Sequence, residues 1–327
     1  MRDRWAAARR ILWAHVQTWR PYTLCYPVLV GVAGAGAGGA AGFAAYVVAG
    51  CGIALGWLAG HYLGDYFDRE LDRIAKPQRP IPSGRLAAET ALACGIGLAV
   101  AAAVLLAWVN WRTLVLVVLA LAGIVAYSKF CKARGFSGNL VRGLITALAF
   151  LIGAMVAAPL PGWAAVAFSA VFLLHDAASN LVGTLRDVDG DRAAGYRSVP
   201  VRSGVRYAAG LAVSLYVAAI LIAAIGLLLP HRPGFPVLLG VAACVGLIAV
   251  LPLPLLAPNL GQARALRAHE YLVAERLILA SAVLARTAPA AAVVPLLALV
   301  LVFSLWTQAV MRSRHEIAAD DMEVQPT

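Results

Sequence analysis

The sequence predicts an all-α protein, a polytopic bundle of about nine membrane-spanning helices. Of its 327 residues, 62% are hydrophobic and only 13% are charged, whereas a soluble domain carries about 25% charged residues. Long apolar runs recur along the chain, and several approach the ~20 residues that a helix needs to cross a bilayer. The runs are too long, and alternate too little with polar residues, for an outer-membrane barrel.

Nine apolar runs fit a membrane span. In chain order they are 11–39, 41–63, 86–109, 113–127, 140–160, 163–174, 207–229, 235–256 and 288–310. A further segment, 269–285, is apolar but contains Glu275 and Arg276. It is a tenth span, a half-helix, or an amphipathic helix lying at the membrane surface. We therefore expect a basic N-terminus (1–10), a membrane domain (11–312) and a disordered polar tail (313–327).

The distribution of basic residues predicts the topology. The formal net charge is +11, and Lys and Arg gather at the N-terminus and in alternate loops, while the loops between are nearly bare. The positive-inside rule places the N-terminus and the even loops in the cytoplasm. Topology and anionic lipids account for this charge, so nucleic acid is not an expected partner. With nine spans the segment 311–316 lies on the outer side of the cell membrane, and with ten spans it lies on the cytoplasmic side.

Two features of composition bear on the cellular setting. The five cysteines include no CxxC pair, and four of them sit inside apolar runs, so we interpret them as small hydrophobic residues. The frequent use of Ala, Arg and Gly suggests a bacterial source with a GC-rich genome.

The first acidic cluster follows the second apolar run, in "LGDYFDRELDRIAKPQRPIPSGRL" (63–86). Glycines at 52, 56, 60 and 64 are spaced by four and fall on one helical face, where 52–60 favours close helix packing. The same spacing continues into Asp68 and Asp72, and Asp65 lies one turn before Asp68. We expect the three carboxylates to point into one cavity.

The second acidic cluster lies in "HDAASNLVGTLRDVDGDRAAGYRSVPVRSG" (175–204). Asp187 and Asp191 are four residues apart, and Asn180 and Asp176 lie progressively deeper on the same predicted face. The charge topology brings both clusters to the cytoplasmic side, where like charges would raise one another's pKa. Mg²⁺, with oxygen ligands, retained waters and a phosphate, resolves this repulsion. The alternative is that both runs are solvated loop starts balanced by arginines.

Basic residues beside the carboxylates extend the interpretation. A metal site alone does not need them, whereas a diphosphate bound to the metal does. The sequence therefore predicts a Mg²⁺-diphosphate site at the cytoplasmic ends of two apolar helices.

Four segments resemble the UbiA superfamily of intramembrane prenyltransferases. "GDYFDRELDRIAKPQRPIPSGR" is similar to its first aspartate-rich motif, and "RDVDGDRAAGYRSVP" to its second. "YSKFCKARGFSGNLVRG" (127–143) resembles the segment after its fourth helix, and "WRPYTLCYPVLVG" the opening of its first. The motifs cover about residues 20–201.

The resemblance implies a nine-helix bundle around a central cavity that is capped on the cytoplasmic side. It implies that the motif aspartates hold Mg²⁺ against an isoprenyl diphosphate, namely Asp65, Asp68, Asp72, Asp187 and Asp191. It also implies substrate contacts from Lys132 and Arg79, with Tyr127 nearby, and from Arg192, which belongs to the second motif. The family usually has Asn where this chain has Gly64. Water or His61 then takes the place of the Asn amide. Alternatively, His61 is an interfacial histidine whose hydrogen bonds are satisfied within the protein.

Three further residues are expected to meet the substrates. Arg20 orients an anionic acceptor or extends to lipid headgroups. Asn180 faces the same cavity as Asp187. Asp176 is costly inside an apolar helix, which by default marks a functional site. We place it in the cavity wall, where it accepts a proton or binds an acceptor hydroxyl.

The leading function is transfer of a prenyl group to a lipophilic acceptor, such as a quinone-precursor ring or a glycerophosphate-type lipid. The metal and basic groups stabilise the departing diphosphate. The alternative is a membrane terpene cyclase that uses no acceptor. A transporter with inverted repeats is disfavoured, because both acidic motifs sit at helix ends rather than at the bilayer midplane.

Overall fold

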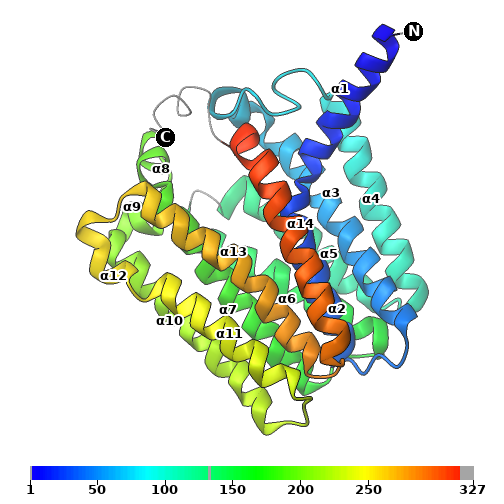
Figure 1. Ribbon diagram of the computed structural model, residues 1–327. Coiled ribbons are helices and arrows are strands. Elements are labelled where there is room, and N and C mark those ends of the chain that lie inside the picture. Colours follow the sequence, from blue (N-terminus) through cyan, green and yellow to red (C-terminus); the bar gives the residue numbers. More distant parts are fainter. Residues whose placement is uncertain (1, 132–133, 317–327) are drawn as a thin grey trace.

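The structure is a computed structural model that describes residues 2–131 and 134–316. The expected all-α membrane bundle is confirmed (Figure 1). Two expectations lie outside the described residues: the substrate contact of Lys132, and the disorder of most of the tail.

Ten long helices make up the body of the bundle. They are α2 (Pro21–Ala37), α3 (Phe43–Ala75), α4 (Ala88–Val109), α5 (Thr113–Ala126), α6 (Ser137–Ala157), α7 (Trp163–Arg186), α10 (Val205–Ile225), α11 (Gly234–Val250), α13 (Gln262–Ala285) and α14 (Ala290–Glu316). The remaining elements are α1 (Arg2–Trp19), a π-helical turn (Tyr127–Cys131), β1 (Arg134–Gly135), α8 (Val188–Ala193), β2 (Arg197–Ser198), α9 (Val199–Ser203), α12 (Leu253–Leu256) and two 3₁₀ turns (Gly226–Leu228 and Ala257–Asn259).

Within the described residues, eight helices are long and apolar enough to cross a membrane, and α2 is a shorter apolar helix. These nine correspond to the nine predicted runs, except that the first run is divided at Arg20 into α1 and α2. The tenth segment lies within α13, which packs against α2, α7, α11 and α14. It is therefore a helix of the bundle and not a surface helix. With α13 included, the end of α14 lies on the same side as α1 and α8 (Figure 1), as expected for ten passes.

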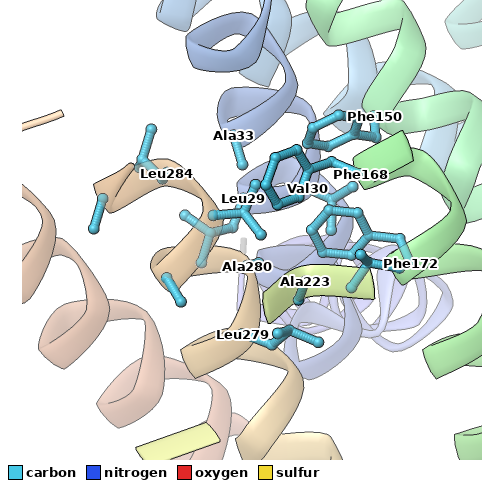
Figure 2. Packing of buried hydrophobic residues seen from close by; sticks show 14 of the residues in the cluster. Leu29, Val30, Ala33, Phe150, Phe168, Phe172, Ala223, Leu279, Ala280 and Leu284 are labelled. Carbon is cyan, nitrogen blue, oxygen red and sulfur yellow. The ribbon is translucent and has the colours of Figure 1, made fainter. Parts of the chain in front are cut away.

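Close backbone contacts hold α2, α6 and α7 together. A Cβ added at Gly153 of α6 would lie 2.0 Å from the carbonyl oxygen of Gly31, and one added at Gly143 would lie 2.1 Å from that of Leu173. These glycines bring the helices close enough for dense packing, as small residues do in membrane bundles. The core beside them is aromatic, with the Phe150 and Phe172 rings 5.1 Å apart. Figure 2 shows Phe150 and Phe172 grouped with Phe168, beside Leu29 and Val30 of α2.

The glycine stripe of α3 serves two purposes. A Cβ at Gly52 would lie 2.6 Å from Leu106 of α4, and one at Gly60 would lie 2.9 Å from Ile124 of α5. Helix packing therefore explains these two positions, as the sequence predicts. Gly56 differs, because a Cβ there would meet nothing within 4 Å. Its missing side chain keeps an internal cavity open.

A small clasp joins two loops at the end of the bundle where α3 and α7 finish. β1 pairs in parallel with β2, so that Arg134 lies opposite Arg197 and Gly135 opposite Ser198. The π-helical turn precedes β1 directly, and such turns are frequent at functional sites. The clasp therefore brings the segment after α5 beside the second aspartate motif.

Candidate active site

A polar cavity of about 280 Å³ lies beneath the clasp. Four of the residues predicted from the sequence line it: Tyr127, Asn180, Asp187 and Asp191. Its walls come mainly from α6, α7, α13 and the clasp. The structure thus places the second aspartate motif at an internal polar site.

The local structure of the second motif differs from the predicted continuous helix. α7 ends at Arg186, and Asp187 caps it before the short helix α8 carries Asp191. The Asp191 amide donates to the Asp187 carbonyl at 2.8 Å, which keeps the two carboxylates on the cavity despite the break. The Asp187 carboxylate accepts two hydrogen bonds from the Arg186 guanidinium, each 2.7 Å long.

The first motif is buried around arginines. Asp65 and Asp72 are each 4% exposed, and Arg79 lies 2.6 Å from Asp72 and 3.8 Å from Asp65. Arg20 also donates to Asp65, while Asp68 is half-buried between them along α3. These three carboxylates do not line the polar cavity, so the structure does not bring the two motifs into one cluster.

The donor chemistry of the first motif fits a hard cation. Its side chains offer carboxylate oxygens, and Asp65 Oδ2 is buried without a hydrogen-bond partner. Among the residues that the structure describes, however, no three His, Cys, Asp or Glu side chains lie close enough to hold a metal ion. In this structure the guanidinium groups of Arg20 and Arg79 supply the positive charge that carboxylates facing one another require.

Arg20 occupies a strained position between α1 and α2. Its φ of 46° is the one positive value found for a non-glycine residue in the described parts of the chain, and such outliers persist where the surroundings over-determine them. The Thr23 amide donates to the Arg20 carbonyl at 2.8 Å. The guanidinium points inward to Asp65 and lies 3.4 Å from His61 Nδ1. The structure therefore favours an internal role for Arg20 over an extension to lipid headgroups.

His61 is held within the same group. Its Nε2 lies 3.0 Å from the Thr23 hydroxyl, which also accepts from Trp57 Nε1 at 3.1 Å. With Nδ1 facing the Arg20 donor, this arrangement requires the tautomer protonated at Nε2. His61 thus positions Arg20 and Thr23, and only Thr23 reaches the polar cavity.

Asp176 and Arg192 lie away from the cavity surface. Asp176 is 4% exposed and accepts a hydrogen bond from Thr146, but it lines neither cavity, whereas we expected it in the wall. Thr146 stands between Asp176 and a second, apolar cavity. Arg192 is exposed, 3.3 Å from Asp189, and does not line the polar cavity either.

The loop after α3 is tied to α1. Arg85 donates to the side chain of Gln17 and to the carbonyl of Gln78. Burial lowers the pKa of the Arg85 guanidinium. The loop that carries Arg79 is therefore held by hydrogen bonds at both ends, which fixes Arg79 against Asp72.

The apolar cavity was not predicted from the sequence. It has a volume of about 60 Å³ and lies among α2, α3, α4, α5 and α6, lined by residues such as Gly56, Trp57, Leu106 and Ile152. The apolar cavity meets the polar cavity at Trp57. Trp57 lines the apolar cavity, Arg142 lines the polar one, and the Arg142 guanidinium lies 5.4 Å from the centre of the Trp57 ring. The two cavities thus form a polar site next to an apolar pocket.

Several polar side chains of the cavity were also missed. Arg142 on α6, His269 and Arg276 on α13, and Gln308 on α14 all line it. The signal available in the sequence was the ionisable residue inside an apolar segment, which by default indicates a functional site. Arg142 and Arg276 both fit that description.

The chain is similar in sequence to known proteins. The model of the UbiA prenyltransferase family matches residues 24–254. A digeranylgeranylglyceryl phosphate synthase from Halobacterium salinarum is 38% identical over 182 residues, which cover 54% of this chain and 63% of that protein. The match thus spans less than two thirds of the relative's length. Such relatives are archaeal, and nothing supports the bacterial source suggested by composition.

Solved structures show the same fold. One structure of a digeranylgeranylglyceryl phosphate synthase has a TM-score of 0.69 at 21% identity, covering 85% of this chain and 98% of that one. A UbiA homologue from Archaeoglobus fulgidus bound to GPP and Mg²⁺ has a TM-score of 0.66 at 16% identity, covering 90% of this chain and 99% of that one. At these identities the likeness concerns the fold alone.

Proposed function

The chain belongs to the UbiA prenyltransferase family, and from that premise we propose that it transfers an isoprenyl group from an isoprenyl diphosphate to a lipophilic acceptor inside the membrane. One observation carries the proposal: a polar cavity with two motif aspartates adjoins an apolar cavity at Trp57 and Arg142. Such a pair of cavities matches an amphiphile with a charged head and a hydrocarbon tail.

The head of this substrate is assigned to the aspartate motifs. We assign Mg²⁺ to two separate groups of carboxylates: Asp65, Asp68 and Asp72 on α3, and Asp187 and Asp191 beside the polar cavity. When bound, the ion would stabilise charge on the departing diphosphate. A Mg²⁺-bound relative of the same fold supports this choice of ion. Diphosphate contacts are proposed for Arg79, which is already positioned between two motif carboxylates, and for Lys132 and Tyr127.

The tail of the substrate is assigned to the apolar cavity. Its walls carry almost no polar groups, and Gly56 leaves room within it. A tail held there excludes water from the reacting carbon, which protects a carbocation once the C1–O bond breaks. The bond to the acceptor then forms at C1, and the proton that the acceptor hydroxyl loses leaves through the polar cavity.

The acceptor is proposed to be a glycerophosphate-type lipid rather than an aromatic ring. The support is the name of the relatives, whose product is a digeranylgeranylglyceryl phosphate. The apolar helices agree with a multi-pass protein. The basic loops and the ends of α3 and α7 favour a site that opens to the cytoplasm.

The test is mass spectrometry of products from the purified protein with Mg²⁺ and geranyl, farnesyl or geranylgeranyl diphosphate. Each donor is supplied alone and then with a prenylated glycerol phosphate. A new mass equal to acceptor plus prenyl group, absent when either substrate is omitted, is expected. A hydrocarbon or terpene alcohol formed without acceptor would instead identify a cyclase, and no consumption of any donor would reject the proposal.

A further inference from the structure

We propose that Thr146 and Asp176 take up the proton that the acceptor loses when it is prenylated, with Thr146 in contact with the acceptor hydroxyl and Asp176 behind it. The inference rests on the proposed function and deepens it, because it requires an acceptor that reacts through a hydroxyl group. It assigns a role to Asp176, a buried carboxylate that the diphosphate site does not use.

The reacting carbon of the donor belongs where the two cavities meet. The diphosphate is assigned to the polar cavity and the hydrocarbon tail to the apolar one, and C1 joins these two parts of the molecule. Trp57 lines the apolar cavity, and its ring lies 5.4 Å from the guanidinium of Arg142, which lines the polar cavity. We therefore assign C1 to the space beside Trp57 and Arg142.

A layer of polar side chains lies one helical turn deeper in the bundle than the polar cavity. Its members are Tyr26 on α2, Thr146 on α6 and Asp176 on α7, each four positions from a residue that lines this cavity (Tyr22, Arg142 and Asn180). Residues four apart share a helical face and are separated by about 6 Å along the axis. Asp176 accepts a hydrogen bond from Thr146 and acts electrostatically on Tyr26, so the layer is one connected group beneath the polar cavity.

Thr146 brings this layer to the apolar cavity. Among the described residues that line that cavity, Thr146 alone carries a hydroxyl group. A hydroxyl has one proton, and that of Thr146 goes to Asp176, because the other acceptor in reach, the Arg142 carbonyl, is 3.5 Å from Oγ1. The lone pairs of Oγ1 can then accept a hydrogen bond from a second hydroxyl group, which we assign to the acceptor.

The surroundings of Asp176 suit a group that holds a proton for part of the reaction cycle. Asp176 is 4% exposed within α7, where an ionised carboxylate is costly. Arg276 acts on the same two neighbours as Asp176, namely Tyr26 and His175, and its positive charge offsets part of that cost. Once Asp176 has taken up a proton it is a neutral acid, which costs less to bury than the charged form.

The proposed step consists of linked bond changes. The C1–O bond of the donor breaks, and its electron pair leaves with the diphosphate. A lone pair of the acceptor oxygen forms the new C1–O bond, and the acceptor O–H bond breaks as its proton moves to Thr146 Oγ1. Thr146 passes its own proton to Asp176 Oδ2, so Thr146 is unchanged and Asp176 becomes neutral. After the product leaves, the proton returns through Thr146 to the polar cavity.

The experiment compares Asp176→Asn, Thr146→Val and Thr146→Ser with the wild type, as full-length proteins in detergent. Steady-state kinetics with Mg²⁺, geranylgeranyl diphosphate and a monoprenylated glycerol phosphate give kcat and a KM for each substrate. Calorimetry without donor compares binding of this acceptor with that of its deoxy analogue, which lacks the free hydroxyl. The matched control is Thr307→Val, because Thr307 is a buried threonine that also contacts the carbonyl four residues before it, but lines neither cavity.

We expect Asp176→Asn and Thr146→Val each to lower kcat by about 10²- to 10³-fold, as loss of a positioned proton acceptor does, and to leave the donor KM within about twofold. Thr146→Ser keeps the hydroxyl and should retain most of kcat, and Thr307→Val should behave as the wild type. The wild type should bind the acceptor about fivefold more tightly than the deoxy analogue, as one hydrogen bond allows. Thr146→Val should lose this preference.

Three results would overturn the inference. The first is an unchanged kcat in Asp176→Asn, which would refute the proton acceptor and leave the proposed function standing. The second is a rise in donor KM as large as the fall in kcat, which would indicate a structural role. The third is equal binding of the acceptor and its deoxy analogue by the wild type. Because calorimetry needs no turnover, a Thr146-dependent preference for the hydroxyl in a protein that forms no prenylated product would refute the proposed function and leave the hydroxyl contact standing.

Discussion

Replacing Gly56 by Leu should shorten the prenyl chain that the protein accepts. Gly56 lines the apolar cavity, and a Cβ there would meet nothing within 4 Å, so the new side chain enters the cavity rather than a helix contact. Its four carbons displace about four carbons of a long prenyl tail. At about 0.8 kcal/mol per buried carbon, the loss is about 3 kcal/mol, or about 200-fold in kcat/KM.

The assay measures kcat/KM for dimethylallyl and geranylgeranyl diphosphate in parallel. The long donor should lose about two orders of magnitude, whereas the short donor, which does not reach Gly56, should change less than about threefold. Gly97→Leu is the matched control, because Gly97 of α4 is exposed and also faces open space. Equal losses for both donors, or no loss for the long one, would refute the assignment of this cavity to the tail.

Three further predictions concern the metal site and the packing. Asp191→Asn should lower turnover by about 10²- to 10³-fold, whereas Asp189→Asn should retain turnover, since Asp189 is exposed and lies outside the cavity; comparable losses in both would contradict the site. Chelation of divalent ions should abolish donor consumption and added Mg²⁺ should restore it, with product yield as the readout. Gly153→Ala should lower the free energy of unfolding by about 1–3 kcal/mol, because its Cβ would lie 2.0 Å from the Gly31 carbonyl oxygen. An unchanged melting temperature in detergent would contradict the close crossing of α2 and α6.

The fold could be predicted from the sequence because membrane helices are specified by their length and apolar composition. The nine apolar runs are found as helices. The first aspartate motif forms the last turns of α3, and the second follows α7 at the same end of the bundle. Both signals are local. A bilayer requires each span to satisfy its backbone hydrogen bonds within its own helix, so the spans can be read one at a time.

The site was predicted less completely because it depends on how the helices face one another. The sequence could not show that Arg79 lies between Asp65 and Asp72, since a loop brings it back to α3. Nor could it show that Asp176 lies behind Thr146 rather than on the cavity surface. Residue spacing predicts which side chains share a helical face, but it does not show which neighbouring helix covers a given side chain.

α13 shows why hydropathy understated the bundle. Glu275 and Arg276 lower the mean hydropathy of this segment. A mean hydropathy treats every charged side chain as one that must reach water or the membrane interface. In the structure each charge has a reason to be inside: Glu275 is enclosed by His175 and Tyr216, and Arg276 faces a polar cavity over Tyr26. Ionisable groups inside membrane helices characteristically pair or face water-filled cavities. The two residues that weaken the hydropathy signal of α13 are therefore the ones that anchor it to α7 and connect it to the site.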